Sequence, residues 1–159
     1  MTVEPKVAMR LTFLARVVRK ECLHLGTTDQ RLFGRLFDVA QAKQLEADPD
    51  LAEQVDAFVG RFGRLQDAVS DKLLPLFLSA LGERTSATID NLDRAERLGL
   101  IGSADEWMTM RKLRNQMVHE YVEDPAILAS ALQSGHVFVP ILIAVAEKII
   151  AEIESRKFA

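Results

Sequence analysis

The sequence predicts an all-α fold, and two observations carry that prediction. Apolar residues recur at spacings of three and four within segments separated by short breaks, which is the period of a helix with one buried face. No segment shows the alternation of apolar and polar residues that marks a half-buried strand. The expected architecture is a helical bundle of about five to six helices.

The first half of the chain contains three of these helices. Two are expected over residues 6–23 and 29–45. Asp48 followed by Pro49 then marks a helix start, because the first turn does not need the N–H that proline lacks. The long amphipathic helix that follows should kink or end at Pro75. Its apolar positions are Leu51, Val55, Phe58, Phe62, Leu65, Val69 and Leu73.

The second half begins with a short helix, expected over residues 88–98 and closed by Gly99. Ser103 and Glu106 have the spacing of a capping box, which opens a helix over about residues 106–118. A last helix is expected from about residue 126. Gly135 and Pro140 leave open whether it is one helix or two pieces.

Length and composition are those of an ordinary globular domain. With 159 residues, of which 48% are hydrophobic and 27% charged, the chain is expected to form one domain over residues 1–159. Cys22 is the only cysteine, which suits a reducing compartment and predicts a cytoplasmic protein. The longest uncharged apolar stretch, residues 137–146, is too short to span a bilayer, so no membrane association is expected.

The charge balance limits how the chain could hold nucleic acid. A formal net charge of -3 argues against binding by bulk electrostatics, which requires a basic stripe. The charge is uneven, however, because residues 1–35 carry seven Lys or Arg and three Asp or Glu. A local basic surface is one interpretation of that excess, and a solvated helix face is the simpler one.

Arg114 occupies a position where a helix would normally carry an apolar residue. On a helix that advances about 100° per residue, Arg114 falls within an apolar arc. The other members of that arc are Trp107, Met110, Leu113, Met117 and Val118. A guanidinium cannot lose its proton to escape burial, so a carboxylate, a carbonyl or a phosphate must meet it.

The neighbours of Arg114 raise a geometric problem. Asn115 and His119 are four residues apart and share a helix face, whereas Arg114 and His119 point about 140° apart on a regular helix. One helix cannot aim both at one atom. Either the helix ends before His119, or the two side chains meet counterparts from a second subunit across a symmetric interface.

Together these residues form a complete R-N-x-x-x-H-x-Y pattern, consisting of Arg114, Asn115, His119 and Tyr121. The pattern resembles the signature of HEPN-domain proteins, and most closely the R-x4-H-x-Y motif of the HepT family. The resemblance extends to the helix start at residues 105–107, to residues 98–101 and to the all-helical layout. It implies an HEPN-type helical bundle that forms a homodimer, with the two motifs facing each other across a cleft.

The resemblance also implies a function, a metal-independent endoribonuclease toxin of a HEPN/MNT toxin–antitoxin pair. Histidine can accept and give a proton near neutral pH, and arginine grips a phosphate bidentately, so His119 and Arg114 are the expected catalytic residues. Asn115 and Tyr121 are expected to support them. The implied partners are RNA and an MNT-type nucleotidyltransferase antitoxin that attaches AMP to Tyr121. The chain carries extra helical sequence before the long helix, which puts the family's partner docking and substrate choice in doubt.

Each of these residues also has a structural interpretation. His119 could interact with the end of its helix, and Tyr121 could pack across it. Arg114 could pair with Asp67 or Asp71, although both project off the apolar face of their helix. The alternative function is a non-catalytic helical module that pairs with a nucleotidyltransferase, and a weaker one is a purely structural helical dimer. No residues have metal-ligand spacing and no phosphate-binding loop is present, so no metal and no cofactor are expected.

Overall fold

The computed structural model describes residues 3–119 and 123–156, and all regular structure within these ranges is helical. In chain order the elements are α1 (Pro5–Leu32), α2 (Val39–Lys43), α3 (Pro49–Asp67), η1 (Ala68–Leu73), α4 (Leu74–Ala80), α5 (Thr88–Arg97), α6 (Ala104–His119) and α7 (Pro125–Arg156). Because α3, η1 and α4 follow one another as a continuous rod, the predicted all-α bundle of five to six helices is confirmed for the described residues.

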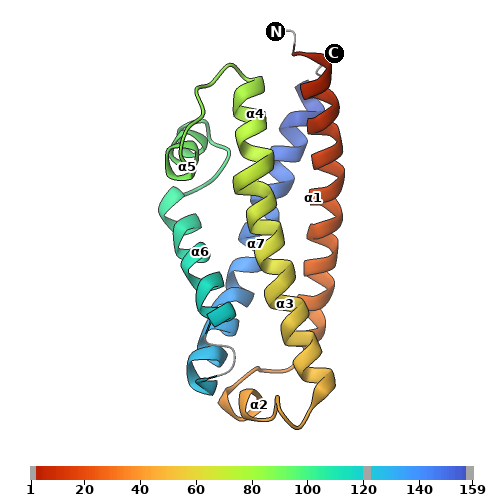
Figure 1. Ribbon diagram of the computed structural model, residues 1–159, viewed down its shortest axis with the longest axis vertical. Helices are drawn as coiled ribbons and strands as arrows, with labels where there is room; N and C mark the ends of the chain where they lie inside the picture. Colours follow the sequence, from red (N-terminus) through yellow and green to blue (C-terminus); the bar gives the residue numbers. More distant parts are fainter. Residues whose placement is uncertain (1–2, 120–122, 157–159) are drawn as a thin grey trace.

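The rod of α3, η1 and α4 occupies the middle of the molecule. It packs against α1 on one side and against α5 and α6 on the other, while α7 contacts α1, α3 and α6 (Figure 1). The short helix α2 closes the end opposite to the one where α1 begins and α7 ends. The bundle therefore places α1 and α6 on opposite sides of the rod.

The first helix is longer than the sequence predicted. Helices over residues 6–23 and 29–45 were expected, but α1 runs unbroken through Gly26 to Leu32, and only the five residues of α2 follow. The spacing of buried positions continues across the glycine, from Leu25 before it to Thr28 and Leu32 after it. Packing of this face against the bundle outweighs the roughly 1 kcal/mol that a glycine costs inside a helix.

Pro75 neither ends the rod nor leaves it purely α-helical. In the preceding segment, η1, the hydrogen bonds take the wider π-helical pattern, and the N–H of Leu74 donates to the carbonyl of Val69, five residues earlier. In an α-helix the proline ring would clash with the carbonyl four residues earlier, that of Asp71. The wider turn relieves this conflict, and α4 resumes the α-helical pattern.

The last helix is one piece, which answers the question that Gly135 and Pro140 left open. Its 32 residues include Pro140 in the interior. Proline has no N–H to donate to the carbonyl four residues earlier, which is that of His136. Because Pro140 lies on the exposed side of α7, water can reach this carbonyl instead. Within the described ranges, no helix is both long enough and apolar enough to cross a membrane.

The core confirms most of the apolar arc predicted on α6. Trp107, Met110, Leu113 and Met117 are all buried, but Val118 is 50% exposed, so its inclusion in the arc was wrong. The buried apolar side chains of the described residues form one cluster. Val118 lies near the end of α6, beyond the part of the helix that this cluster covers.

The single cysteine should be chemically inert in the folded protein. Burial, together with the nearby carboxylates of Glu147 and Glu21, raises the pKa of Cys22 from its ordinary 9.0 to about 12. Because the thiolate is the reacting form, the native protein at pH 8 should resist a disulfide-forming thiol reagent for hours. Denaturant should restore one equivalent of reaction within minutes, since Cys22 is the only cysteine. Rapid labelling of the folded protein would contradict this environment.

Candidate functional site

Two caps fix the start of α6, the helix that carries the motif. The Oγ atom of Ser103 accepts the N–H of Glu106 at 3.0 Å, as the capping box predicted. A second cap, from Glu96 of the neighbouring segment α5, accepts the N–H of Ala104 at 2.7 Å. Helix starts leave N–H groups without helical partners, and two of them are satisfied here. The caps also join α5 to α6.

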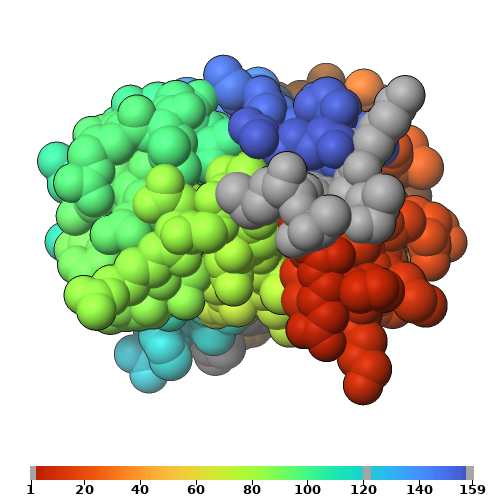
Figure 2. Space-filling model, turned by 90° about the horizontal axis from the view of Figure 1, so that it is seen from above, coloured from red at the N-terminus to blue at the C-terminus, as the bar shows by residue number. Residues whose placement is uncertain are grey.

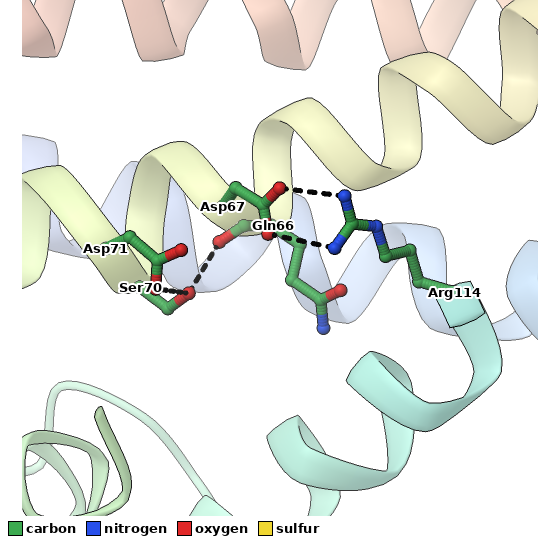
Figure 3. A network of polar contacts seen from close by, with 5 residues as sticks. All are labelled: Gln66, Asp67, Ser70, Asp71 and Arg114. Atoms are coloured by element: carbon green, nitrogen blue, oxygen red, sulfur yellow. Dashed lines mark hydrogen bonds and ion pairs between the residues drawn. The ribbon is translucent and has the colours of Figure 1, made fainter. Parts of the chain in front are cut away.

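Arg114 is held by a carboxylate of α3. Its Nη2 lies 3.0 Å from Oδ2 of Asp67 and its Nη1 lies 3.4 Å from Oδ1, so the two planar groups meet with two parallel contacts (Figure 3). Of the two carboxylates considered from the sequence, Asp67 is thus the partner, while Asp71 accepts a hydrogen bond from Ser70. The side chains of Arg114 and Asp67 are 30% and 35% exposed, which limits the free energy of the pair to roughly 1 kcal/mol.

A glycine lets Arg114 lie this close to α3. A Cβ atom at Gly63 would lie 2.9 Å from Nε of Arg114, closer than such atoms can approach. The same side of α3 carries buried Gln66, whose Nε2 donates to the carbonyl of Trp107 at 3.4 Å. Helix α6 therefore meets α3 through small and polar residues, and Arg114 bridges the edge of that contact.

Asn115 and His119 lie on a different side of α6 from Arg114. Both are exposed, and they share a face because they are four residues apart. Helix α6 continues through His119, so the helix does not end before it. Arg114 and His119 leave the helix about 140° apart, and the structure does not bring them together within one chain. Tyr121 lies outside the described residues.

A groove of about 390 Å³ runs beside the motif helix, between α6 and α7. Leu113 and Gln116 line its α6 side, and Ile127 and Ser130 line its α7 side. Ile127 is 42% exposed. The end of α6 is therefore flanked by apolar surface that the described residues leave uncovered.

The described residues contain no cluster of three His, Cys, Asp or Glu side chains that could hold a metal ion. No family model matches the chain, and comparisons with curated proteins and with solved structures found no match. The resemblance to HepT-like proteins therefore rests on the motif and the neighbouring residues quoted above.

Gly63 was not among the residues predicted from the sequence. A signal was available, because Gly60 and Gly63 lie three residues apart inside a long helix, where each glycine costs about 1 kcal/mol relative to alanine. Glycines retained at that cost indicate a close approach by a neighbouring group. At Gly63 that neighbour is the Arg114 guanidinium. At Gly60, the atom nearest to an added methyl group would be Nη1 of Arg64, at an ordinary 3.8 Å.

Gly60→Ala and Gly63→Ala should therefore differ in their effect on stability. Gly60→Ala should raise the free energy of unfolding by about 1 kcal/mol, because alanine favours the helix and meets no clash. Gly63→Ala should gain clearly less or lose stability, because its methyl group pushes Arg114 away from Asp67. Urea unfolding followed by circular dichroism measures both changes.

The Arg114→Ala background provides the control for this comparison. With the guanidinium removed, Gly63→Ala should recover the gain seen for Gly60→Ala. If the two glycine variants were equally stabilised when Arg114 is present, Arg114 would not lie against Gly63.

Proposed function

We propose that this protein is a metal-independent endoribonuclease of the HEPN class and that Arg114 and His119 carry the reaction. One observation supports this proposal most directly. Arg114 is oriented by Asp67 yet remains 30% exposed, and the next turn of the same helix presents His119 and Asn115 to solvent. A cation in a fixed orientation and an accessible imidazole are the two groups that a metal-free cleavage of RNA needs.

The chemistry uses the ribose 2′-hydroxyl as the nucleophile. His119 takes its proton, the 2′-oxygen bonds to phosphorus, and the bond from phosphorus to the 5′-oxygen breaks. The leaving 5′-oxygen accepts a proton, so the products are a 2′,3′-cyclic phosphate and a 5′-hydroxyl. Arg114 stabilises the charge that grows on the phosphate oxygens. Asp67 occupies two of the five N–H donors of a guanidinium, which leaves three for the phosphate.

The proposed active form is a homodimer of HEPN-type bundles. Within one chain, Arg114 and His119 diverge by about 140° around α6, so a shared phosphate requires the motifs of two subunits to face each other. The groove between α6 and α7 and the exposed side chains of Val118 and Ile127 supply apolar surface beside the motif. A second copy of the chain covers such surface in a symmetric dimer. The two His119 residues then serve as base and acid.

The proposal includes regulation as a toxin. An MNT-type nucleotidyltransferase antitoxin would attach AMP to Tyr121, adding a phosphate charge to the motif and closing the site. This part rests on the motif alone, since Tyr121 lies outside the described residues.

A second candidate function is a non-catalytic module that binds a nucleotidyltransferase. The Arg114–Asp67 pair favours it, because Asp67 already balances the charge of the guanidinium within the chain. In that case Arg114 orders the contact between α3 and α6, and His119 serves only as a hydrogen-bonding group on the surface.

Growth arrest and RNA cleavage separate the two functions. Induction of the wild type should stop growth, and the purified protein should cut RNA in the presence of a chelator, leaving 2′,3′-cyclic phosphate ends. Arg114→Ala and His119→Ala should each lower the cleavage rate on the order of 100-fold or more, because each removes a group that acts in the transition state.

The chain offers matched controls for both variants. Arg111 is a partly buried arginine one turn earlier on α6, and His24 is an exposed histidine of α1, so Arg111→Ala and His24→Ala should keep near-normal cleavage. All variants require a normal circular dichroism spectrum. A folded wild type that neither stops growth nor cuts RNA without its partner would favour the binding module.

Exchanging the charges of the ion pair separates its structural role from its catalytic role. Asp67→Ala and Arg114→Ala should each destabilise the fold modestly, by roughly 1 kcal/mol. The double variant Asp67→Arg/Arg114→Asp should regain part of that stability but should not regain cleavage, because the guanidinium then projects from α3. Recovery of cleavage together with stability would mean that the pair acts only through the fold. Urea unfolding and the rate of RNA cleavage measure the two effects.

A further inference from the structure

The side of α1 that faces away from the bundle is basic and partly apolar. Its residues recur at spacings of three and four and are all exposed. This surface, called the basic face below, consists of Lys6, Met9, Arg10, Phe13, Arg16 and Lys20. Met9 and Phe13 are 73% and 44% exposed, so two large apolar side chains stand among four cations. Glu21, the nearest acidic residue of α1, lies on the flank with one carboxylate oxygen buried.

The cations of the basic face form no ion pair with any described residue. Arg19, on another side of the same helix, differs in this respect, because it pairs with Glu154 of α7 at 2.7 Å. The pairing divides α1 into two sides. On one side Arg19 links α1 to α7 through an exposed ion pair, whereas the basic face leaves its charge available to a ligand.

Phe13 stands between two guanidinium groups. The Cζ atom of Arg10 lies 5.2 Å from the centre of the Phe13 ring, and that of Arg16 lies 5.9 Å from it. A base can take the place of one guanidinium on the face of this partly exposed ring, and the displaced arginine then supplies donors for the adjoining phosphate. Neither core packing nor solubility requires a phenylalanine at such a position.

A groove of about 430 Å³ adjoins the basic face, between α1 and the segment formed by η1 and α4. Figure 2 shows the first turns of α1 beside α4 at this end of the molecule. Arg10 and Lys72 contribute cations from its two walls, Ser79 and Thr85 contribute hydroxyl groups, and none of the described residues that line it carries a carboxylate. The volume falls in the range of pockets that hold one small ligand, roughly 300–1,000 Å³. Its charge and hydroxyl groups suit a phosphate-bearing ligand.

We propose that single-stranded RNA binds along the basic face, with a base stacked on Phe13 and phosphates held by Arg10, Arg16 and Lys72. The inference rests on the proposed function, because it describes how the substrate of the nuclease is held. The basic face and the motif helix lie on opposite sides of the rod formed by α3, η1 and α4 (Figure 1). The contact therefore adds affinity for a long strand and takes no part in the chemistry.

Binding of a fluorescent single-stranded oligouridine tests the proposal. The full chain carrying His119→Ala serves as the parent, so that the RNA is not cut during an anisotropy titration. Phe13→Leu should weaken binding on the order of 10-fold, because leucine keeps the apolar bulk but cannot stack, and Phe13→Trp should bind at least as well as the parent. Arg10→Ala and Lys72→Ala should each lower the slope of log affinity against log salt by about 0.7.

Arg19→Ala is the matched control, since it removes one positive charge from the same helix outside the basic face. It should leave RNA affinity within about twofold of the parent, because its cation is already paired with Glu154. Equal weakening by Arg10→Ala and Arg19→Ala would indicate a nonspecific effect of net charge and would overturn the proposal.

The kinetics distinguish this inference from the proposed function. In the otherwise wild-type enzyme, Phe13→Leu should raise the KM for a long RNA and leave kcat unchanged. If RNA affinity depends on Phe13 but the wild type does not cleave RNA, binding of RNA to the basic face is supported and the proposed nuclease activity is wrong. If the variants keep parental RNA affinity but lose binding to fluorescent polyglutamate, the basic face receives an acidic protein, and the RNA proposal is wrong.

Discussion

The organisation of the candidate site depends on the contact of Arg114 with Asp67 across Gly63. A guanidinium keeps its charge under all conditions that a folded protein experiences, so a chain that turns it toward a neighbouring helix must provide both space and a partner. Glycine provides the space and aspartate the partner. The buried side chains of α6, namely Trp107, Met110, Leu113 and Met117, set the rotation of the helix about its own axis, and that rotation directs Arg114 toward α3. Asn115 and His119 then face solvent as a geometric consequence.

The fold could be predicted from the sequence because helical periodicity is repeated in every segment, but the helix boundaries could not. A break was expected between residues 23 and 29, and Gly135 and Pro140 left open whether the last helix was one piece, yet α1 runs through Gly26 and α7 runs through Pro140. Inside a helix, a glycine costs about 1 kcal/mol and a proline about 3 kcal/mol relative to alanine. Packing along α1 and α7 outweighs these costs, and the sequence alone does not show how much surface each helix buries.

The site was predictable only in part, for a related reason. A helical wheel with one apolar face places Asp67 away from the core, yet α3 is covered on two sides, by α1 and by α6. The second covered side carries Gly63 and Gln66 and continues in η1 with Ser70, and these small or polar side chains are not recognised as a buried apolar stripe. Asp67 could be named as a candidate partner for Arg114 but not chosen over Asp71. The meeting of Arg114 and His119 in the proposed active form requires a second subunit, and no pattern within one chain specifies how two subunits would pack.

The π-helical segment η1 has a consequence for how the rod could change in length. Each π-type hydrogen bond encloses one residue more than an α-type bond, so the segment holds surplus chain. Loss of one residue there could be absorbed by a return to the α-helical pattern, without breaking the rod. The residues beyond it would then keep their directions relative to Asp67, because the residue lost is the one that the wider turn holds in surplus. The wall that α4 forms for the groove beside α1 follows Asp67 along the same rod, so a rod shortened by one residue at η1 would preserve the angle between the two surfaces.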